Sequence, residues 1–255
     1  MGAMPGRHQS LDLLFLGSGN AFGAGGKAFS SFLLNGRYLF DCGPTVLQQL
    51  RKAGVPPSDI EVVLVSHFHA DHFFGLPFLF LDARYKGRTK DICVVGPPGI
   101  QERTETLLRI GYPGVLETEP TFKRRYIEIA DGFQANVAGL SVLASVVDHV
   151  AEMECFAFRA ELGDRSLVYS GDTTLCDGLL RLVKDADVIV LECSCEDIPV
   201  HLGAAGVEEV ARRASPGAQL VVTHLDGNEH SHPLILSLSK DAGLHVAEDL
   251  ARFSF

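Results

Sequence analysis

The sequence lacks an apolar run long enough to cross a membrane. Its longest apolar stretch, residues 73–81, is interrupted by Gly75 and Pro77 and falls far short of the roughly 20 residues that a membrane helix needs. The first ten residues are polar and glycine-rich, unlike the apolar segment of a secretory signal. These absences predict a cytoplasmic protein with no membrane partner.

The sequence also lacks an excess of positive charge. Its 22 lysine and arginine residues are outnumbered by 32 aspartate and glutamate residues, which gives a formal net charge of -10. Because long-range attraction of RNA or DNA depends on a basic surface, a nucleic-acid partner is not favoured. Bound divalent cations would offset part of this negative charge locally.

A disulfide framework and a linker are absent as well. The six cysteines are scattered and mostly lie inside apolar runs, so we interpret them as small buried thiols. With 46% hydrophobic and 21% charged residues, the 255 residues are predicted to form a single globular domain, residues 1–255. Residues 1–10 are expected to be disordered or left over from cloning.

Strand and helix patterns alternate along much of the chain, as in a layered α/β domain. Strands are predicted at residues 11–16, 29–34, 38–40, 62–65, 92–95, 126–129, 140–147, 155–160, 167–169, 188–191 and 220–223. Helices are predicted at residues 45–53, 74–84, 100–110, 179–185 and 206–214. The glycine-rich stretch 17–26 is not followed by a helix, so we interpret it as the flexible lip of a pocket and not as a nucleotide loop. The basic runs 86–90 and 123–125 are interpreted as solvated turns, against the alternative that they contact an anionic substrate.

One short motif, residues 67–72, contains three histidines and one aspartate directly after an apolar run. His67 and His69 share one side of an extended segment, while Asp71 and His72 turn back at a helix start. Neutral imidazole is the commonest nitrogen ligand of zinc. The spacing therefore predicts ligands for two adjacent ions, against the alternative of a solvent-facing loop that happens to be rich in histidine.

Further candidate ligands follow later strands, at the points where these strands give way to loops. We expect the seven candidates to form two sets with one shared carboxylate: His67, His69 and His149 for one ion, Asp71, His72 and His224 for the other, and Asp172 between them. A bridging carboxylate holds two ions ~3.5–4 Å apart, the separation used by two-metal hydrolases. Asp41 also ends a strand, and it either orients a metal-binding histidine or caps the following helix.

In these residues the sequence resembles the metallo-β-lactamase fold superfamily, from Leu13 to His224. The resemblance implies an α/β fold arranged as a four-layer αββα sandwich, with the metals at the edge between the two sheets. His69 sets the chain apart from the di-iron flavoprotein branch, which has a carboxylate there. Asp172 sets it apart from true β-lactamases, which have a cysteine.

Two phosphodiesterase groups of this superfamily look most similar. Residues 41–43, 96–99, 169–173 and 222–224 resemble ribonuclease Z, and residues 191–194 with His201 are similar both to it and to the cyclic-phosphate phosphodiesterases of phosphonate breakdown. The resemblance implies that His201 lies over the metals and protonates the leaving alkoxide or steadies the phosphoryl oxygens, while Glu192 orients it. The alternative for His201 is an ordinary histidine at a helix start. With Asp71, these two residues are the expected catalytic groups.

One departure from ribonuclease Z shapes the functional prediction. Only residues 150–171 separate His149 from Asp172, whereas ribonuclease Z inserts there a long arm that grips transfer RNA. We therefore expect a dinuclear metal-dependent hydrolase, a phosphodiesterase in which metal-bound hydroxide attacks a small or accessible phosphodiester. The alternatives are a ribonuclease Z-like RNA endonuclease, a glyoxalase-like thioester or lactone hydrolase, and a non-catalytic metal-stabilised binding module.

The same residues bear on cofactors and partners. Two divalent ions are expected, with zinc favoured and manganese or iron compatible with imidazole and carboxylate ligands. The expected substrate is a small molecule or a short phosphodiester. A homodimer that uses the apolar segment 73–80 is compatible with the sequence.

Overall fold

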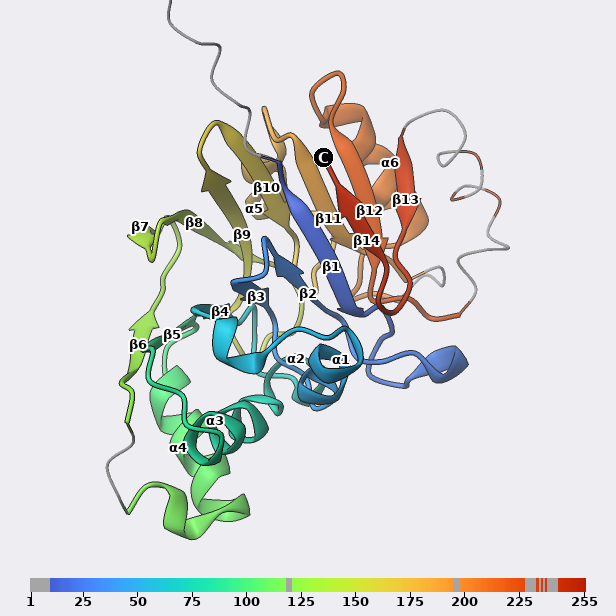
Figure 1. The fold of residues 1–255 in the computed structure, drawn as a ribbon. Helices are drawn as coiled ribbons and strands as arrows, with labels where there is room; N and C mark the ends of the chain where they lie inside the picture. Colours follow the sequence, from blue (N-terminus) through green and yellow to red (C-terminus); the bar gives the residue numbers. More distant parts are fainter. Residues whose placement is uncertain are drawn as a thin grey trace, which may run out of the picture.

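The computed structural model describes residues 10–117, 121–194, 198–227 and 243–255, together with Pro233, Ile235 and Ser237. Two mixed sheets pack face to face, and helices cover the outer face of each sheet (Figure 1). This is the four-layer αββα sandwich that the resemblance implies. The expectation for the N-terminal leader falls on residues 1–9, which lie outside the described part of the chain.

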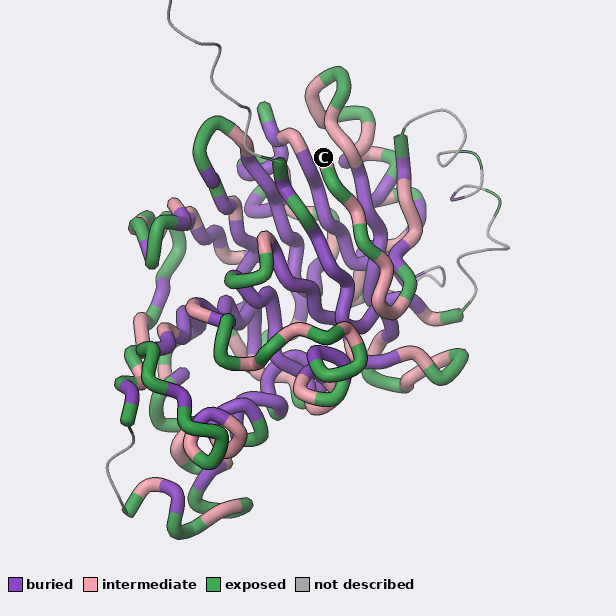
Figure 2. Tube along the Cα trace, in the orientation of Figure 1, coloured by how far each residue is buried: buried purple, intermediate pink, exposed green. Residues whose placement is uncertain are grey.

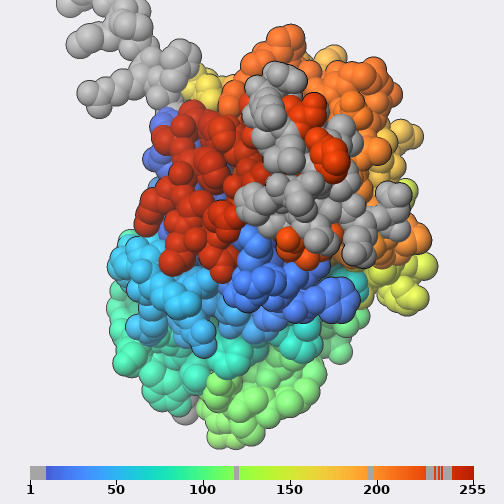
Figure 3. Space-filling model, turned by 90° about the vertical axis from the view of Figure 1, so that its right-hand side faces the viewer, coloured from blue at the N-terminus to red at the C-terminus, as the bar shows by residue number. Residues whose placement is uncertain are grey.

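The first sheet has the strand order β14-β1-β2-β3-β4-β5-β6. Neighbours from β14 to β3 are antiparallel, and those from β3 to β6 are parallel. Its strands are β1 (Asp12–Gly17), β2 (Ser31–Leu34), β3 (Tyr38–Phe40), β4 (Val62–Leu64), β5 (Ile92–Gly96), β6 (Arg124–Glu128) and β14 (Arg252–Ser254). Figure 3 shows the C-terminal segment in dark red on the same face of the molecule as the blue N-terminal segment.

The second sheet has the strand order β13-β12-β11-β10-β9-β8-β7. Neighbours from β7 to β10 are antiparallel, and those from β10 to β13 are parallel. Its strands are β7 (Gln134–Val137), β8 (Leu140–Val147), β9 (Cys155–Leu162), β10 (Arg165–Tyr169), β11 (Val188–Glu192), β12 (Gln219–Thr223) and β13 (Leu244–Val246).

Three apolar layers hold the sandwich together. Between the sheets, Phe32 and Phe40 stack with ring centroids 4.5 Å apart, and Tyr169 of the opposite sheet meets both rings edge-on. The helices that cover the first sheet are α1 (Val46–Lys52), α2 (Ala70–Phe73), α3 (Leu76–Tyr85) and α4 (Ile100–Gly111). The helices that cover the second sheet are α5 (Asp177–Val183) and α6 (Ala204–Arg213). Figure 2 shows the resulting buried strands in the middle of the molecule.

All the strands and helices predicted above are present, with ends shifted by at most two residues. Strands β7, β13 and β14 were not predicted, because they are short and carry polar residues in place of an apolar run. In the described ranges, no helix combines the length and the apolar character needed to span a bilayer.

The interpretation of residues 86–90 as a solvated turn is wrong for Arg88. Its side chain is buried, and its guanidinium donates to the carbonyl oxygens of five residues, namely Pro57, Ser58, Ile60, Lys90 and Asp91. Five donors in a fixed fork suit arginine to this role. Arg88 thus ties the turn before β5 to the turn before β4.

The stacked aromatic core provides a direct test of this packing. We expect Phe32→Ala to lower the free energy of unfolding of the metal-free protein by about 3–5 kcal/mol, because it leaves a cavity between the sheets. Phe22→Ala is the matched control, since Phe22 is 89% exposed and Phe32 only 1%. Urea denaturation measures both variants, and an equal loss in the two would contradict the assignment of Phe32 to the core.

Candidate metal centre

The predicted ligands gather at one end of the sandwich, in the loops that follow the strands. From the first sheet, His67 and His69 follow β4, and Asp71 and His72 lie in α2. From the second sheet, three ligands follow β8, β10 and β12: His149, Asp172 and His224. Since these three strands run in the same direction, their carboxyl ends meet at one edge, opposite the end of β4.

The first set of potential ligands consists of His67, His69, His149 and Asp172, whose ligating atoms all lie within 4.8 Å of one another. His149 Nε2 and His69 Nδ1 are 3.2 Å apart. Asp172 Oδ2 lies 3.8 Å from His67 Nε2 and 3.9 Å from His149 Nε2. Ligands about 2.0–2.2 Å from a tetrahedral zinc ion are separated by about 3.3–3.6 Å, so these four atoms are close to the spacing that a metal needs.

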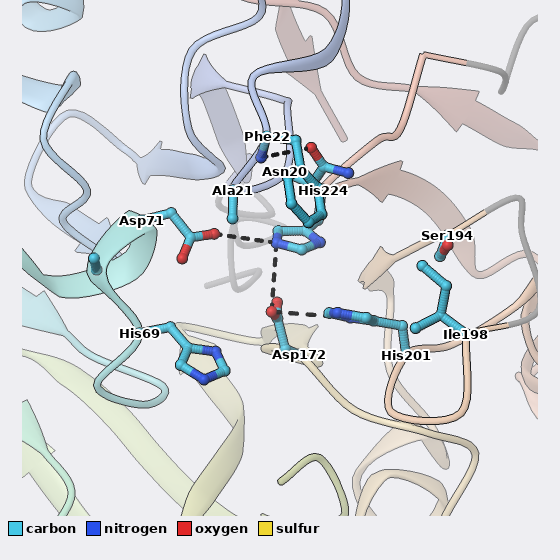
Figure 4. A pocket seen from close by; sticks show the side chains of 11 residues that line it. Asn20, Ala21, Phe22, His69, Asp71, Asp172, Ser194, Ile198, His201 and His224 are labelled. Carbon is cyan, nitrogen blue, oxygen red and sulfur yellow. Dashed lines mark hydrogen bonds and ion pairs between the residues drawn. The ribbon is translucent and has the colours of Figure 1, made fainter.

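The second set is tighter. Asp71, His72 and His224 form a group of potential ligands, and Asp172 adjoins it. Asp71 Oδ2 lies 3.2 Å from His72 Nε2 and 3.4 Å from His224 Nε2. Asp172 Oδ1 lies 3.3 Å from His72 Nε2, and Asp172 Oδ2 lies 3.4 Å from His224 Nε2. Figure 4 shows His224 between the two carboxylates.

Three buried atoms at this centre have no hydrogen-bond partner among the described residues. They are His67 Nε2, His72 Nε2 and Asp172 Oδ1. Buried polar atoms are normally paired, because an unpaired one costs roughly 1–3 kcal/mol. Here the unpaired atoms converge within both ligand sets, so the residues present fit two cations with Asp172 shared between them.

The charges at the centre suit metal binding. Burial lowers the pKa of His67 well below its usual range, and the neighbouring His72 lowers it further, which favours a neutral ligand. Burial also disfavours a charge on Asp172, but His224 and His72 hold the pKa of this carboxyl well below its usual range. The pKa of His72 shifts in the opposite direction from that of His67. Burial acts to lower it, but Asp172, Asp41 and Asp71 outweigh burial and raise this pKa well above its usual value. The space among these carboxylates therefore stabilises a positive charge.

Asp41 lies behind the ligands and does not cap a helix. Its Oδ2 is 2.7 Å from His72 Nδ1, whereas the N-cap of α1 is Thr45. The observed contact favours the first of the two roles considered for Asp41, the orientation of a metal-binding histidine. Asp41 and His224 both have left-handed backbones, with φ of 55° and 57°, a conformation that non-glycine residues rarely adopt outside constrained sites.

Glycine at position 43 allows the metal motif to approach this strand end closely. A Cβ atom on Gly43 would lie 1.9 Å from the Asp71 carbonyl oxygen. The adjacent Cys42 N donates to the His72 carbonyl over 2.7 Å. The backbone of α2 therefore rests directly on residues 42–43, which fixes the direction in which Asp71 and His72 point.

His201 and Glu192 form a pair beside the second ligand set. His201 Nδ1 lies 2.8 Å from Glu192 Oε2, and Glu192 Oε1 accepts a hydrogen bond from Thr173 N. His201 lies in the turn before the α6 cap Gly203, and its ring bonds Glu192 in place of the helix backbone. Burial acts to lower the pKa of His201, but the hydrogen bond and charge of Glu192 raise it overall. Glu192 and His201 also form, with Asp172 and His224, a third group of potential ligands.

A cavity of about 300 Å³ opens directly onto the centre. Its lining includes the metal-site residues His69, Asp71, Asp172 and His224, then His201, and residues 20–22 of the glycine-rich stretch (Figure 4). This stretch therefore does form the lip of a pocket. Ser194 and Ile198, from the segment between β11 and α6, also line the cavity.

The base of the lip is fixed by Asp249, a residue that sequence reasoning missed. Its Oδ1 accepts hydrogen bonds of 3.0 Å from Ser18 N and Ser18 Oγ, and its Oδ2 accepts one of 2.8 Å from Ala28 N. One carboxylate thus holds the chain at Ser18, near the start of the stretch, and at Ala28, just after its end. No local pattern around Asp249 could have indicated this, because its partners lie more than 200 residues earlier in the sequence.

Comparisons with known proteins agree with this architecture. Residues 11–226 match the model of a protein family described as Anti-Pycsar protein Apyc1. Ribonuclease Z from Methanosarcina mazei is 26% identical and aligns with 84% of this chain and 87% of its own length. The metallo-β-lactamase fold protein YhfI from Bacillus subtilis superposes with a TM-score of 0.77 at 20% identity, over 95% of this chain and 99% of YhfI.

A fourth comparison concerns a diphosphatase from the PhnP family. Its structure superposes with a TM-score of 0.72 at 18% identity, over 97% of this chain and 98% of that protein. These likenesses confirm the metallo-β-lactamase fold and the resemblance to the ribonuclease Z and phosphodiesterase branch.

The two ligand sets can be separated by experiment. We expect His149→Ala to lose one of two bound ions, because His149 belongs only to the first set. Metal content per chain, measured by mass spectrometry after zinc loading and desalting, checks this. His245→Ala is the control, since His245 packs on Phe253 and Phe255 away from the centre. Loss of both ions, or of neither, would contradict the division into two sets.

Proposed function

We propose that this chain, which belongs to the Anti-Pycsar protein Apyc1 family and is a hydrolase of the metallo-β-lactamase fold, is a dinuclear phosphodiesterase acting on a small or accessible phosphodiester. One observation carries the proposal. Asp172 belongs to the first ligand set and lies 3.3 Å from His72 and 3.4 Å from His224 of the second, and His201, which Glu192 holds, lines the same cavity as Asp172.

The seven predicted ligands would hold two divalent ions, with zinc favoured by the imidazole-rich first set. When bound, such ions polarise a phosphoryl oxygen and lower the pKa of a coordinated water. The chain's own contribution is to hold the ligands: His67 Nε2, His72 Nε2 and Asp172 Oδ1 are buried within the two sets and have no hydrogen-bond partner among the described residues. Asp71 is a ligand in this proposal and borders the cavity where substrate would lie.

His201 is the proposed proton donor to the leaving oxygen. Its Nδ1 is occupied by Glu192, which leaves Nε2 as the ring atom available to a substrate in the cavity. Glu192 is buried and held by Thr173 N and Ser170 Oγ, the latter bonding its backbone N–H. Glu192 is therefore a rigid support that sets the orientation of the His201 ring.

The cavity and its surroundings favour a small substrate. A volume of about 300 Å³ is at the lower end of the roughly 300–1,000 Å³ typical of small-molecule sites. Between His149 and Asp172 the chain forms the hairpin of β9 and β10, whose strands are separated only by residues 163–164. This connection contains no arm that could grip an RNA, which makes the ribonuclease alternative the weaker one.

The proposed location is the cytoplasm, and a dimer through residues 73–80 remains part of the proposal.

A substrate panel tests the proposed function. Zinc-loaded protein should hydrolyse bis-p-nitrophenyl phosphate and small cyclic or linear phosphodiesters, and a chelator should abolish this turnover. Turnover of a thioester or a lactone with no phosphodiester turnover would favour the glyoxalase-like alternative. Cleavage of an unprocessed transfer RNA at a much higher rate than any small diester would favour the endonuclease. Two bound ions without any hydrolysis would indicate a binding module.

The role of His201 leads to a separate prediction. We expect His201→Ala to lower kcat by about 10²–10⁴-fold, the usual effect of a lost general acid, while both ions stay bound. His245→Ala is again the control and should keep both kcat and the metal content. A His201→Ala enzyme with unchanged kcat, or one that loses an ion, would contradict the proton-donor role.

A further inference from the structure

Asp41 is the buried acceptor of four hydrogen bonds. Its side chain is fully buried, and its Oδ1 accepts from Ser66 N over 2.7 Å. Its Oδ2 contacts three groups: Ser66 Oγ at 2.8 Å, Tyr169 OH at 2.6 Å and His72 Nδ1 at 2.7 Å. A carboxylate has no hydrogen to give, so every one of these groups must donate to it.

The direction of these bonds determines the tautomer of His72. Because Nδ1 donates its hydrogen to Asp41, Nε2 is the ring nitrogen that faces Asp71 and Asp172, and it is the one that would bind a metal once its own proton is displaced. This is the nitrogen that has no hydrogen-bond partner in the described chain. Asp41 thus prepares a ligand of the second set directly.

The same carboxylate also reaches the first set, through Ser66. The single hydroxyl hydrogen of Ser66 is given to Asp41, so Ser66 Oγ can only accept from His67 Nδ1, which lies 2.9 Å away. His67 Nε2 then presents its lone pair to His69, His149 and Asp172. It too has no partner among the residues described.

We propose that Asp41 is a positioning residue shared by both metal sets: it holds His72 of one set directly and His67 of the other through Ser66, so that both rings present Nε2 to the metals. The inference rests on the dinuclear site of the proposed function but not on the substrate. It predicts that loss of the Asp41 acceptor lowers the affinity for both ions, whereas loss of the Ser66 hydroxyl lowers the affinity for only one.

Tyr169 provides a way to separate this role from simple structural support. It belongs to β10 of the second sheet, and its single hydroxyl hydrogen goes to the same Oδ2 atom, so it donates to neither His67 nor His72. Tyr169→Phe removes one buried hydrogen bond on Asp41 and leaves the acceptor and both histidine tautomers in place. It is therefore the matched control for Asp41→Asn.

The test is zinc binding, measured by competition with a chromophoric chelator. In Asp41→Asn, either orientation of the amide places its NH₂ group against a donor, so we expect both affinities to fall by about 10–100-fold. Ser66→Ala should weaken one ion to a similar degree, and Tyr169→Phe should leave both affinities unchanged. In a His149→Ala background, where only the second set remains, Asp41→Asn should still weaken the bound ion and Ser66→Ala should not.

Several results would overturn the proposal. One is an Asp41→Asn protein whose affinity falls for one ion only. Another is a Ser66→Ala change that lowers the affinity for the ion left in the His149→Ala background. The third is a Tyr169→Phe protein whose affinities fall as far as those of Asp41→Asn. If Asp41→Asn does not fold, nitrogen NMR of the cadmium-loaded wild-type protein decides. His67 and His72 should both carry a proton on Nδ1 and bind cadmium through Nε2, and the reverse arrangement in either ring excludes the shared role. Failure of phosphodiester turnover with both ions bound would reject only the proposed function.

Discussion

A cluster of polar side chains at the end of an apolar sandwich is the constraint on which this structure depends. Imidazole and carboxylate groups from loops of both sheets meet below the cavity, most of them buried, and three of their atoms have no hydrogen-bond partner within the described residues. Burying such groups is unfavourable unless hydrogen bonds or cations compensate for the lost solvation. Asp41 and Glu192 accept hydrogen bonds from the Nδ1 atoms of His72 and His201. The atoms of the two ligand sets that have no such partner are the ones that cations would bind.

The layers beneath the site explain how so polar a cluster can persist. Strands β4, β10 and β12 are almost wholly buried, and their loops inherit positions fixed by the packing of Phe32, Phe40 and Tyr169. Tyr169 connects the apolar core with the polar cluster, because its ring packs in the core while its hydroxyl donates to Asp41. The fold and the candidate metal centre therefore depend on the same packing arrangement.

The sequence predicted side chains that the fold does bring together, and it suggested supporting roles for Asp41 and Glu192, but it did not indicate Ser66 or Asp249. The His67–His72 motif is dense, and His149, Asp172 and His224 each end an apolar run, so chemistry and position point the same way. Ser66 and Asp249 carry no such signal, because a single serine or aspartate acts only through partners that folding brings near. Strand β14 was missed for a related reason: its pairing with β1 depends on a tertiary contact, and its own residues are half polar. Arg88 resembled a surface charge until its five carbonyl partners were in place.

The anchoring of the lip at Asp249 has a thermodynamic consequence for any molecule that enters the cavity. A loop that must become ordered around its ligand loses conformational entropy at that moment, and the loss is subtracted from the binding free energy. Here residues 18 and 28 are already bound to one carboxylate, and Asn20 Oδ1 accepts from Phe22 N within the turn. Because both ends of the rim are held, a ligand that contacts Phe22 would lose less of its binding free energy to ordering of this stretch than one that meets an unanchored loop.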